Sequence, residues 1–381
     1  MKTVAIISYN IHSNHMNYGA ALHSYAFQQY LQKIGIESIV FDYVPKKLEN
    51  YHIKYPIFNY CRIWHPRAFL RHLLIWGLGF WDNIQKFKKF RAFFSVHLQY
   101  TPHTYTYSEL MSGAVIPKLE NAIFVCESDV IWKLYDADGF DDVFFLNFPF
   151  TKGKSKVAYA PSIGSRLFND SEVQRFKELV QDFKAISTRE KQGADYISAI
   201  LNQKIDWMLD PTFLLSASDY SKIANQPLES HYVLLYNCMI NDAEMVKEAE
   251  RFAVSKGLSL IEISNYYINK LKYHHKVICN AGIEDWLGYF QNADYVICNA
   301  FHGFCFSVIF KKQVFLFLRD DSDYRMKNIT DAFGVSERLI HFNNKTIPLQ
   351  MTDIDYDSVY EKLDVLRLKS DHYIKENIIS T

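Results

Sequence analysis

Short apolar runs alternate with amphipathic segments along nearly the whole chain. Val4–Ser8 opens this pattern as a buried strand, and apolar side chains then recur at three- and four-residue steps over Ala20–Lys33, as on one face of a helix. Glu37–Asp42 follows as a second strand. A strand, a loop, a helix and a strand in this order predict a right-handed parallel unit.

The same alternation continues towards the C-terminus. Further strands are predicted at Glu120–Val125, Lys156–Tyr159, Ala185–Ser187, Lys204–Leu209, His231–Tyr236, Ser259–Ile263, Tyr295–Cys298 and Gln313–Leu318, and further helices at Ser171–Phe183, Asp242–Lys256, Gly282–Asn292, Met326–Phe333 and Tyr356–Lys375. Strands that alternate with helices predict an α/β fold, here two Rossmann-like domains with largely parallel sheets that face each other across a cleft.

The polar segment Ser216–Ser230 is interpreted as the linker between the two domains. It gives an N-terminal domain of residues 1–217 and a C-terminal domain of residues 218–381 that includes the final helix. Residues 43–107 are rich in tyrosine, proline, histidine and basic side chains and show no clear period. This segment is predicted to be an insertion or a flap over a site.

The stretch Asn292–Phe310 has the most suggestive pattern, a buried strand, a tight polar turn and an apolar helix. Ligands of open parallel sheets bind beyond the carboxyl ends of the strands, where Asn299, His302 and Gly303 are expected. The glycine would let the backbone approach a ligand, and the helix start offers free N–H groups to an anion. A histidine there can exchange a proton near neutral pH. The alternative is an ordinary turn in which the histidine only caps the helix.

Polar side chains also follow other predicted strands. These candidate binding residues are Asn17, Tyr18, Gly19, Ser128, Asp129, Trp132, Ser162, Arg189, Arg319 and Arg325. Polar groups followed by an indole can hold a sugar, and arginine presents a planar fork to carboxylate or phosphate. Three of these sites also have an ordinary interpretation. The Asn17 segment can be a plain strand-to-helix loop, since it lacks the dinucleotide fingerprint, Ser128 or Asp129 can be a helix cap, and Arg189 can form a surface ion pair with Glu190 or a neighbour.

The composition indicates which kinds of ligand and cellular environment the protein has. Basic and acidic residues balance at 42 each, so nothing indicates nucleic-acid binding. Six cysteines show neither a CxxC pair nor metal-ligand spacing, which predicts reduced core residues, a cytoplasmic protein and no metal site. The N-terminus predicts a first strand rather than a signal peptide.

The segment Leu73–Trp81 is strongly apolar but far shorter than the ~20 residues of a spanning helix. Basic residues flank it on both sides, at Arg67, Arg71, Lys86, Lys88, Lys89 and Arg91. Two interpretations stay open. The segment is either a helix packed beneath a flap or an amphipathic insertion that touches a membrane surface, here the inner face.

Four blocks in a fixed order resemble the polysaccharide pyruvyl transferase family. They are NYGAALHSYAFQQYL from Asn17, YAPSIG from Tyr159, ISTREKQGADYI and then LDPTFLL from Ile186, and NADYVICNAFHGFCFSVIF from Asn292. The segment CESDVIWK from Cys126 is similar to the family's glycine-serine-aspartate block before a tryptophan. The resemblance runs from the first strand to about Asn328, and the ordered set is more specific than any single block.

The resemblance implies an enzyme that transfers pyruvate from phosphoenolpyruvate onto two hydroxyls of one sugar, forms a cyclic ketal and releases phosphate. It also implies a GT-B-like pair of domains, with the acceptor on the first and the donor on the second. The acceptor would be a sugar of a polysaccharide or of a lipid-linked precursor. No cofactor or metal is expected beyond phosphoenolpyruvate as co-substrate.

By this resemblance, His302 takes part in donor binding and proton transfer, and Arg189 and Arg325 bind the anionic groups of the donor. We add Arg319, Asn299 and Gly303 to the donor side. The acceptor side is expected to comprise Asn17, Tyr18, Gly19, Ser128, Asp129, Trp132 and Ser162.

Two positions depart from the family pattern. Ala300 and Phe301 stand where many members carry an arginine close before the histidine, so phosphate binding must come from other arginines. Glu127 stands where a glycine is expected before Ser128, which points to a changed acceptor or reduced activity. Two further functions therefore stay open, a glycosyltransferase that uses a nucleotide sugar and a non-catalytic sugar-binding relative.

Overall fold

The computed structural model describes residues 3–9, 16–48, 66–135, 139–320 and 323–379, without the side chains of Lys47 and of residues 66–76. Contacts divide the chain into two compact units. Unit 1 comprises Met1–Glu49, Phe94–Leu215 and Leu363–Thr381, and unit 2 comprises Asn50–Phe93 and Ser216–Lys362.

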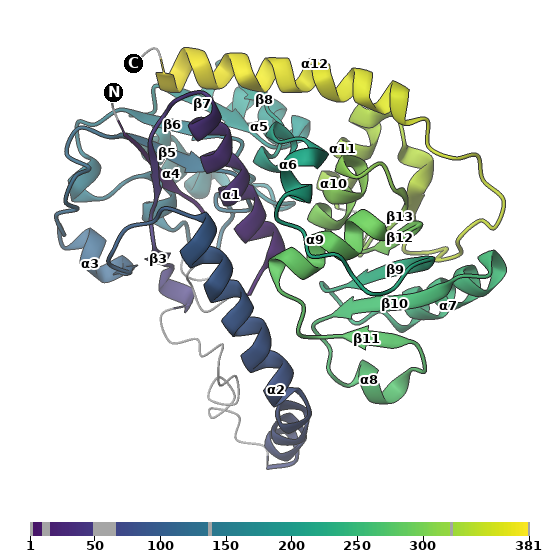
Figure 1. Cartoon of the computed structure of the whole chain (residues 1–381). Helices are drawn as coiled ribbons and strands as arrows, with labels where there is room; N and C mark the ends of the chain where they lie inside the picture. Colours follow the sequence, from purple (N-terminus) through teal and green to yellow (C-terminus); the bar gives the residue numbers. More distant parts are fainter. Residues whose placement is uncertain (1–2, 10–15, 49–65, 136–138, 321–322, 380–381) are drawn as a thin grey trace. The chain divides into compact units, whose positions relative to one another are not determined.

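Unit 1 contains a six-stranded parallel sheet in the order β2-β1-β5-β6-β7-β8 (Figure 1). Its strands are β1 (Val4–Ile7), β2 (Ser38–Val40), β5 (Ile123–Glu127), β6 (Lys156–Tyr159), β7 (Ala185–Thr188) and β8 (Asp206–Trp207). β1 and β5 are buried along their whole length, as expected of parallel strands covered on both faces. Because β2 and β5 lie on opposite sides of β1, the strand order reverses between β1 and β5, and such switch points bind ligands in open α/β sheets.

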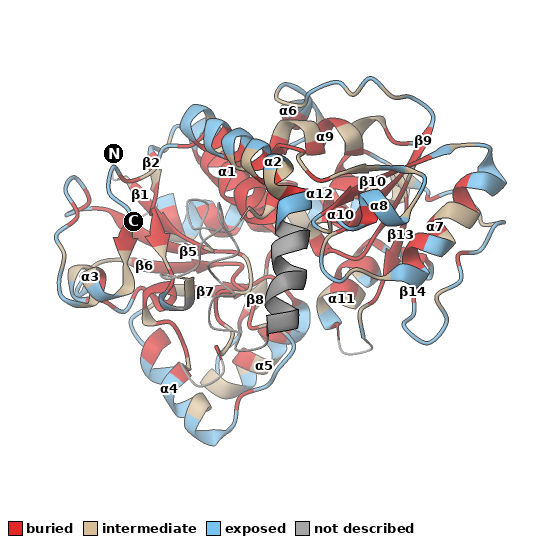
Figure 2. Cartoon of the chain, turned by 90° about the horizontal axis from the view of Figure 1, so that it is seen from below, coloured by how far each residue is buried: buried red, intermediate tan, exposed pale blue. Residues whose placement is uncertain are grey.

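The other elements of unit 1 surround or extend this sheet. They are the helices α1 (Tyr18–Lys33), α3 (Tyr107–Met111), α4 (Asp170–Val180) and α5 (Lys191–Leu201), and a small parallel pair, β3 (Tyr43–Val44) with β4 (Tyr105–Thr106). Figure 2 shows the strands β1, β5 and β6 as buried, whereas α4 and α5 carry exposed residues on one side. The helices therefore supply the amphipathic layer that the sequence pattern predicts.

Unit 2 contains a second six-stranded parallel sheet in the order β11-β10-β9-β12-β13-β14. Numbered within the sheet, this is the 3-2-1-4-5-6 order of a Rossmann fold, with its switch point between β9 and β12. The strands are β9 (Tyr232–Asn237), β10 (Ser259–Ser264), β11 (Lys276–Ile278), β12 (Tyr295–Cys298), β13 (Gln313–Phe317) and β14 (Leu339–Ile340). The helices are α6 (Ala217–Ser221), α7 (Ala243–Lys256), α8 (Asn269–Lys272), α9 (Ile283–Asn292), α10 (Phe301–Ile309) and α11 (Tyr324–Phe333).

These two sheets confirm the predicted α/β fold with two Rossmann-like domains. Several elements agree closely with the sequence pattern because their end signals are local. Asp242 caps α7 by accepting from the Glu244 and Met245 N–H groups, and Gly257 closes the helix with a φ of 65°. Left-handed backbone of this kind favours glycine at a helix end.

The prediction that residues 43–107 are irregular is wrong for Pro66–His97, which form the helix α2. Buried positions recur along it at Gly79, Asn83, Lys86 and Phe90, with helical spacing. The hydrophobic pattern does not mark this helix, because two of these four buried residues, Asn83 and Lys86, are polar. Residues 49–65 of the same segment lie outside the described part of the chain.

The structure describes only part of the apolar segment Leu73–Trp81, because the side chains of residues 73–76 are not among the described ones. Leu78 and Trp81 are 50% and 71% exposed, and Lys86 is buried, so it does not belong to an exposed basic flank. No described helix is long and apolar enough to cross a membrane. Contact with a membrane surface stays a prediction.

The units differ from the domains predicted as 1–217 and 218–381. Residues 50–93 group with unit 2, where Tyr267 Oη donates to Asn83 Oδ1 (3.2 Å) and Lys86 Nζ donates to Asn265 Oδ1 (2.8 Å). The last helix, α12 (Tyr356–Ile374), begins in unit 2 and ends in unit 1. A single cut in the sequence cannot describe a chain that passes between units more than once.

Candidate functional site

Glu127 and His23 form a buried pair at the switch point of unit 1. Glu127 ends β5, His23 lies on α1, and both side chains are fully buried, with 2.9 Å between His23 Nδ1 and Glu127 Oε1. Ser24 Oγ donates to the same carboxylate (3.4 Å), and Ser8 Oγ donates to the Glu127 carbonyl. Burial alone would lower the pKa of His23, but the negative charges of Glu127 and Asp129 and the hydrogen bond to Glu127 outweigh it and raise the pKa to about 10.

Asp129 lies on a strained turn directly after this pair. Ser128 and Asp129 have φ angles of 42° and 54°, a left-handed conformation that non-glycine residues rarely adopt. The Asp129 carboxylate is 3.7 Å from His23 Nε2 and 4.0 Å from Arg189 Nη2, and its side chain is 15% exposed. Backbone strain at a strand end is a common feature of functional sites.

Arg189 is predicted to bind the donor, but the structure places its side chain among carboxylates of unit 1. Its guanidinium donates to Asp210 Oδ2 (3.0 Å) and to Glu190 Oε1 (3.2 Å), and the side chain is only 2% exposed. Burial would lower its pKa, but these carboxylates and Asp129 raise it. The alternative ion pair with Glu190 is therefore present, although buried, and Arg189 acts here as a fixed buried cation.

Other predicted acceptor residues have local structural roles. Asn17 Oδ1 caps α1 by accepting from the N–H groups of Gly19 (2.9 Å) and Ala20 (3.3 Å), and Tyr18 is buried. Ser162 is buried too, and its N–H donates to the Asp129 carbonyl (2.8 Å), so it fixes the strained turn from β6.

Trp132 belongs to the core rather than to an acceptor site. Its ring is fully buried and stacks on Phe145 with 5.1 Å between centroids, while its indole N–H donates to the Phe144 carbonyl (3.3 Å). The ring has no exposed surface and its polar edge is in use, so the ring cannot hold a sugar. The sequence pattern of polar residues followed by a tryptophan cannot distinguish a core tryptophan from one that binds a sugar.

In unit 2, Asn299 lies at the switch point directly after β12. Its amide donates to the Ile240 carbonyl (3.1 Å) and its Oδ1 accepts weakly from the Cys238 N–H (3.4 Å). These bonds tie the end of β12 to the loop after β9. Asn299 is thus correctly placed at the carboxyl edge, where it organises the backbone around the site.

His302 is the second residue of α10, where helix N–H groups point outwards and favour anions. Its ring is half-buried and lies edge-on to Phe301, at 5.3 Å and 88°. Gly303 packs the helix closely, and its role on the donor side stays a prediction. An added Cβ would come within 3.0 Å of Cys298 Cβ and of Tyr236 Cδ1.

Arg319 and Arg325 share one buried carboxylate beyond the end of β13. Arg319 Nη2 donates to Asp323 Oδ2 (2.9 Å) and Arg325 Nε donates to Asp323 Oδ1 (3.3 Å). The arginine side chains are 25% and 17% exposed, whereas that of Asp323 is 2% exposed. Both guanidinium groups are thus held by one carboxylate and stay partly accessible. In contrast to Arg189, these arginines can offer N–H donors to an anion.

Unit 2 also contains a buried polar network around β10 that the sequence analysis did not predict. Glu262 on β10 is fully buried and accepts from Asn269 (2.8 Å) and Asn237 (3.2 Å), and its other oxygen lies 3.0 Å from His275 Nε2. His275 Nδ1 lies 3.0 Å from Glu250. Burial would lower the pKa of His275, but both carboxylates raise it. One acidic residue in an apolar strand was the available signal.

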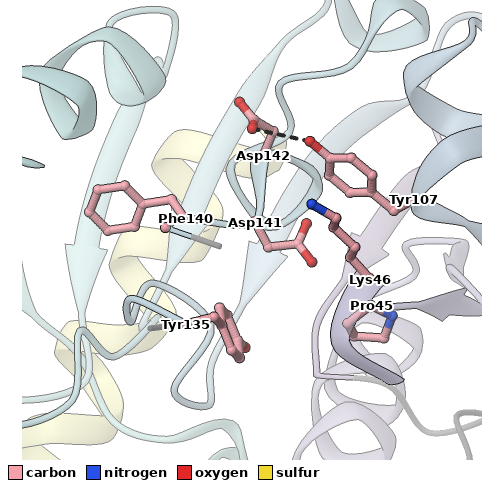
Figure 3. A pocket seen from close by; sticks show the side chains of 8 residues that line it. Pro45, Lys46, Tyr107, Tyr135, Phe140, Asp141 and Asp142 are labelled. Carbon is pink, nitrogen blue, oxygen red and sulfur yellow. Dashed lines mark hydrogen bonds between the residues drawn. The ribbon is translucent and has the colours of Figure 1, made fainter. Parts of the chain in front are cut away.

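Unit 1 also has a small cavity of about 80 Å³ (Figure 3). It is lined by Pro45, Lys46, Tyr107, Tyr135, Gly139, Phe140, Asp141 and Asp142. Tyr107 Oη donates to Asp142 (3.4 Å), and Asp141 accepts from Tyr43 Oη (2.7 Å). Aromatic rings beside carboxylates suit sugars.

Together, the fold and the polar groups at both switch points define an α/β protein with two Rossmann-like units and candidate sites at the carboxyl ends of its strands. A family model described as polysaccharide pyruvyl transferase matches residues 17–321, most of the chain. The protein therefore belongs to the polysaccharide pyruvyl transferase family, as the four sequence blocks predict.

Many solved structures match the chain, and several that align with nearly all of it, such as the three that follow, share little sequence identity with it. The UDP co-structure of S. aureus MnaA is 12% identical with a TM-score of 0.47, and the alignment covers 99% of this chain and 91% of that one. Acinetobacter baumannii MurG is 9% identical with a TM-score of 0.45, and both chains are covered completely. The N-terminal domain of Candida albicans trehalose-6-phosphate phosphatase is 10% identical with a TM-score of 0.48, covering 100% and 97%. No curated protein sequence matches the chain.

Proposed function

We propose that the protein transfers pyruvate from phosphoenolpyruvate onto two hydroxyls of one sugar, in a polysaccharide or its precursor, forming a cyclic ketal and releasing phosphate. Membership of the family carries this proposal. His302 at the start of α10 and the arginine pair around Asp323 support it, because they provide a proton-transfer group and anion ligands at one edge of the unit 2 sheet.

The proposed chemistry balances without a metal or redox step. A proton is added to the methylene carbon of phosphoenolpyruvate, and the cationic central carbon is attacked by a sugar hydroxyl oxygen. The second hydroxyl then displaces phosphate at the same carbon. Of the two hydroxyl protons lost, one replaces the proton used on the methylene group and one leaves with phosphate. His302 is the proposed acid for the first step.

Arg319 and Arg325 are the proposed ligands of the donor's carboxylate and phosphate. They would compensate for Ala300 and Phe301, which replace the arginine found near the histidine in many members. Arg189 is a weaker candidate than the sequence indicated, because Asp210 and Glu190 already occupy its guanidinium. The N–H groups at the start of α10 would add further donors to the same anions.

The donor assignment is tested by thermal shift with phosphoenolpyruvate, using UDP, GDP and phosphate as controls. We expect only phosphoenolpyruvate to raise the melting temperature. The affinity obtained from this titration should be at least tenfold weaker in Arg325→Gln. The matched control is Arg251→Gln, because Arg251 on α7 also pairs with a carboxylate, Glu248 (2.7 Å). A shift for a nucleotide alone would favour a glycosyltransferase, and no shift for any ligand would favour a non-catalytic relative.

The reaction itself is tested in D₂O with sugar acceptors. Pyruvyl transfer places one solvent deuterium in the methyl group of each ketal, because the methylene carbon gains one proton. Glycosyl transfer would place none. His302→Asn is expected to keep the phosphoenolpyruvate shift and to lose turnover by 10²–10⁴-fold. Full turnover by this variant would show that His302 is not the acid.

A further inference from the structure

The helix α2 brings a buried lysine to the carboxyl edge of the unit 2 sheet. Lys86 is 3% exposed, which is rare for a lysine side chain. Its Nζ donates to Oδ1 of Asn265 (2.8 Å), the residue directly after β10. The Asn265 amide donates in turn to the carbonyl of Cys238 (3.4 Å), the residue directly after β9. The ammonium group therefore lies where β9 and β10 end, beside the switch point of unit 2.

The neighbouring turns of α2 run along the same edge. Gln85 Oε1 accepts from the Asn280 amide (2.7 Å) in the loop after β11, and Lys89 Nζ pairs with Asp285 (2.7 Å) in the first turn of α9. All of these residues belong to unit 2. This part of α2 thus follows the edge at which open parallel sheets bind ligands.

The thiol of Cys238 connects Lys86 with the arginine pair around Asp323. Burial raises the pKa of Cys238 to about 11, and the positive charges of Lys86 and Arg319 both act against this rise. A charge affects a pKa in this way only from nearby, so both cations lie close to the same thiol. Lys86 is therefore a further cation in the region where Arg319 is proposed to bind the donor.

The surroundings of Lys86 differ from those of Arg189, whose guanidinium is held by carboxylates. Lys86 Nζ donates to a neutral amide, and burial lowers its pKa to about 8. The nearby thiols of Cys279 and Cys238 offset this effect only in part. A buried cation costs free energy, and an approaching anion recovers some of it. Asn265 is itself exposed, so its amide oxygen can give way to an oxygen of an incoming anion.

We propose that Lys86 is a further ligand of the donor and binds an anionic oxygen of phosphoenolpyruvate at the carboxyl edge of unit 2, together with Arg319 and Arg325. This inference rests on the proposed function and uses residues of unit 2 alone. A lysine binds phosphate as a compact point charge, whereas the planar fork of arginine suits a carboxylate. Lys86 thereby supplies a cation that the sequence block around His302 lacks.

The first test is Lys86→Met, which removes the charge and keeps a long side chain. We expect the affinity for phosphoenolpyruvate, measured by calorimetric titration, to fall at least tenfold. The melting temperature of the ligand-free variant should equal or exceed that of the wild type, because an apolar side chain replaces a buried charge. A lysine that only supports the fold would give the opposite result, a lower melting temperature with unchanged affinity.

The second test keeps the lysine and changes its neighbour. Asn265→Asp places a permanent carboxylate beside Lys86 Nζ, where it competes with the anionic groups of the donor. We expect this variant to bind phosphoenolpyruvate at least tenfold more weakly and to have a higher melting temperature without ligand. It decides the question even if Lys86→Met does not fold, and unchanged affinity in Asn265→Asp would contradict the inference.

Lys89→Met is the matched control, because Lys89 lies on the same helix but is 43% exposed and pairs with Asp285. Its affinity for phosphoenolpyruvate should stay within twofold of that of the wild type. The inference is overturned if folded Lys86→Met keeps the wild-type affinity, or if Lys89→Met loses as much. A wild-type protein that binds phosphoenolpyruvate but forms no ketal would overturn the proposed function alone. A wild-type protein that does not bind phosphoenolpyruvate would overturn both.

Discussion

Asp323 fixes the geometry of the two arginines that we assign to the donor. Its buried carboxylate accepts one N–H group from Arg319 and one from Arg325, so both guanidinium planes are oriented before any ligand arrives. Preorganised donors bind an anion better than mobile ones, because less side-chain entropy is lost on binding. The carboxylate also reduces the net positive charge of the group.

These two effects make opposite predictions for Asp323→Asn. If orientation dominates, phosphoenolpyruvate binding weakens about tenfold, or about 1.4 kcal/mol, although the group becomes more positive. If charge dominates, binding tightens. We expect weakening, measured by calorimetric titration. Asp285→Asn is the control, because Asp285 pairs with Lys89 (2.7 Å) elsewhere in unit 2.

The buried His23 also predicts a pH dependence of stability. Its pKa is raised from 6.5 to about 10 in the folded protein, mainly by Glu127 against the opposing effect of burial. A raised pKa stabilises the fold fully below pH 6.5, and this contribution, on the order of a few kcal/mol, is lost as the pH rises to 10. The free energy of unfolding, relative to that of His23→Gln/Glu127→Gln, should fall across this window. A constant difference between pH 6 and 10 would show that His23 is not protonated in the fold.

At the scale of elements, α10 is seated directly on its own sheet. Gly303 makes this possible, since a Cβ there would come within 3.0 Å of β9 and β12 side-chain atoms. His302 precedes it on the same helix, so the depth of α10 sets the position of the histidine. The glycine acts through packing, and the histidine acts through its place at the helix start.

Gly303→Ala is therefore expected to shift α10 and to lower turnover at least tenfold, with a loss of stability of about 1–3 kcal/mol from overpacking. The control is Gly77→Ala on α2, where an added Cβ meets no atom within 4 Å. That change should be neutral or stabilising by up to about 1 kcal/mol, because alanine favours helices. The melting temperature and the turnover of both variants are measured. If Gly303→Ala loses no more stability and turnover than Gly77→Ala, close packing at Gly303 does not position α10.

At the scale of the whole molecule, α12 is a core element of unit 1 although it begins in unit 2. Tyr373 is 8% exposed and its Oη donates to the Ala158 carbonyl on β6 (2.9 Å). Ser370 Oγ accepts from the Leu209 N–H (3.1 Å). The last turns of the chain thus complete the first unit.

Tyr373→Ala should consequently destabilise unit 1 by about 3 kcal/mol, the usual cost of truncating a buried aromatic residue. Hydrogen exchange should accelerate in β1, β5 and β6 more than in β9 and β12. Leu368→Ala is the control on the same helix, because Leu368 is 70% exposed and its loss should cost less than about 0.5 kcal/mol. Equal acceleration in both sheets would contradict the assignment of the helix end to unit 1.

The sequence by itself determined the fold class and the edges that bear the candidate sites. Hydrophobic period and end signals are local, so β6 and α7 were predicted almost to the residue. Parallel strands bring their carboxyl ends to one edge, and this rule correctly placed Asn299 and Asp129 just after strands and His302 at the start of the helix that follows β12.

Only the tertiary structure decided which side chains contact one another. His23 and Glu127 are 104 positions apart, and their contact depends on β5 lying next to β1, which no local period encodes. The same holds for Trp132, whose indole is taken up by distant aromatic rings, and for Arg189, which buried carboxylates hold. Sequence pattern reports the environment of each residue along the chain, whereas strand order decides its neighbours.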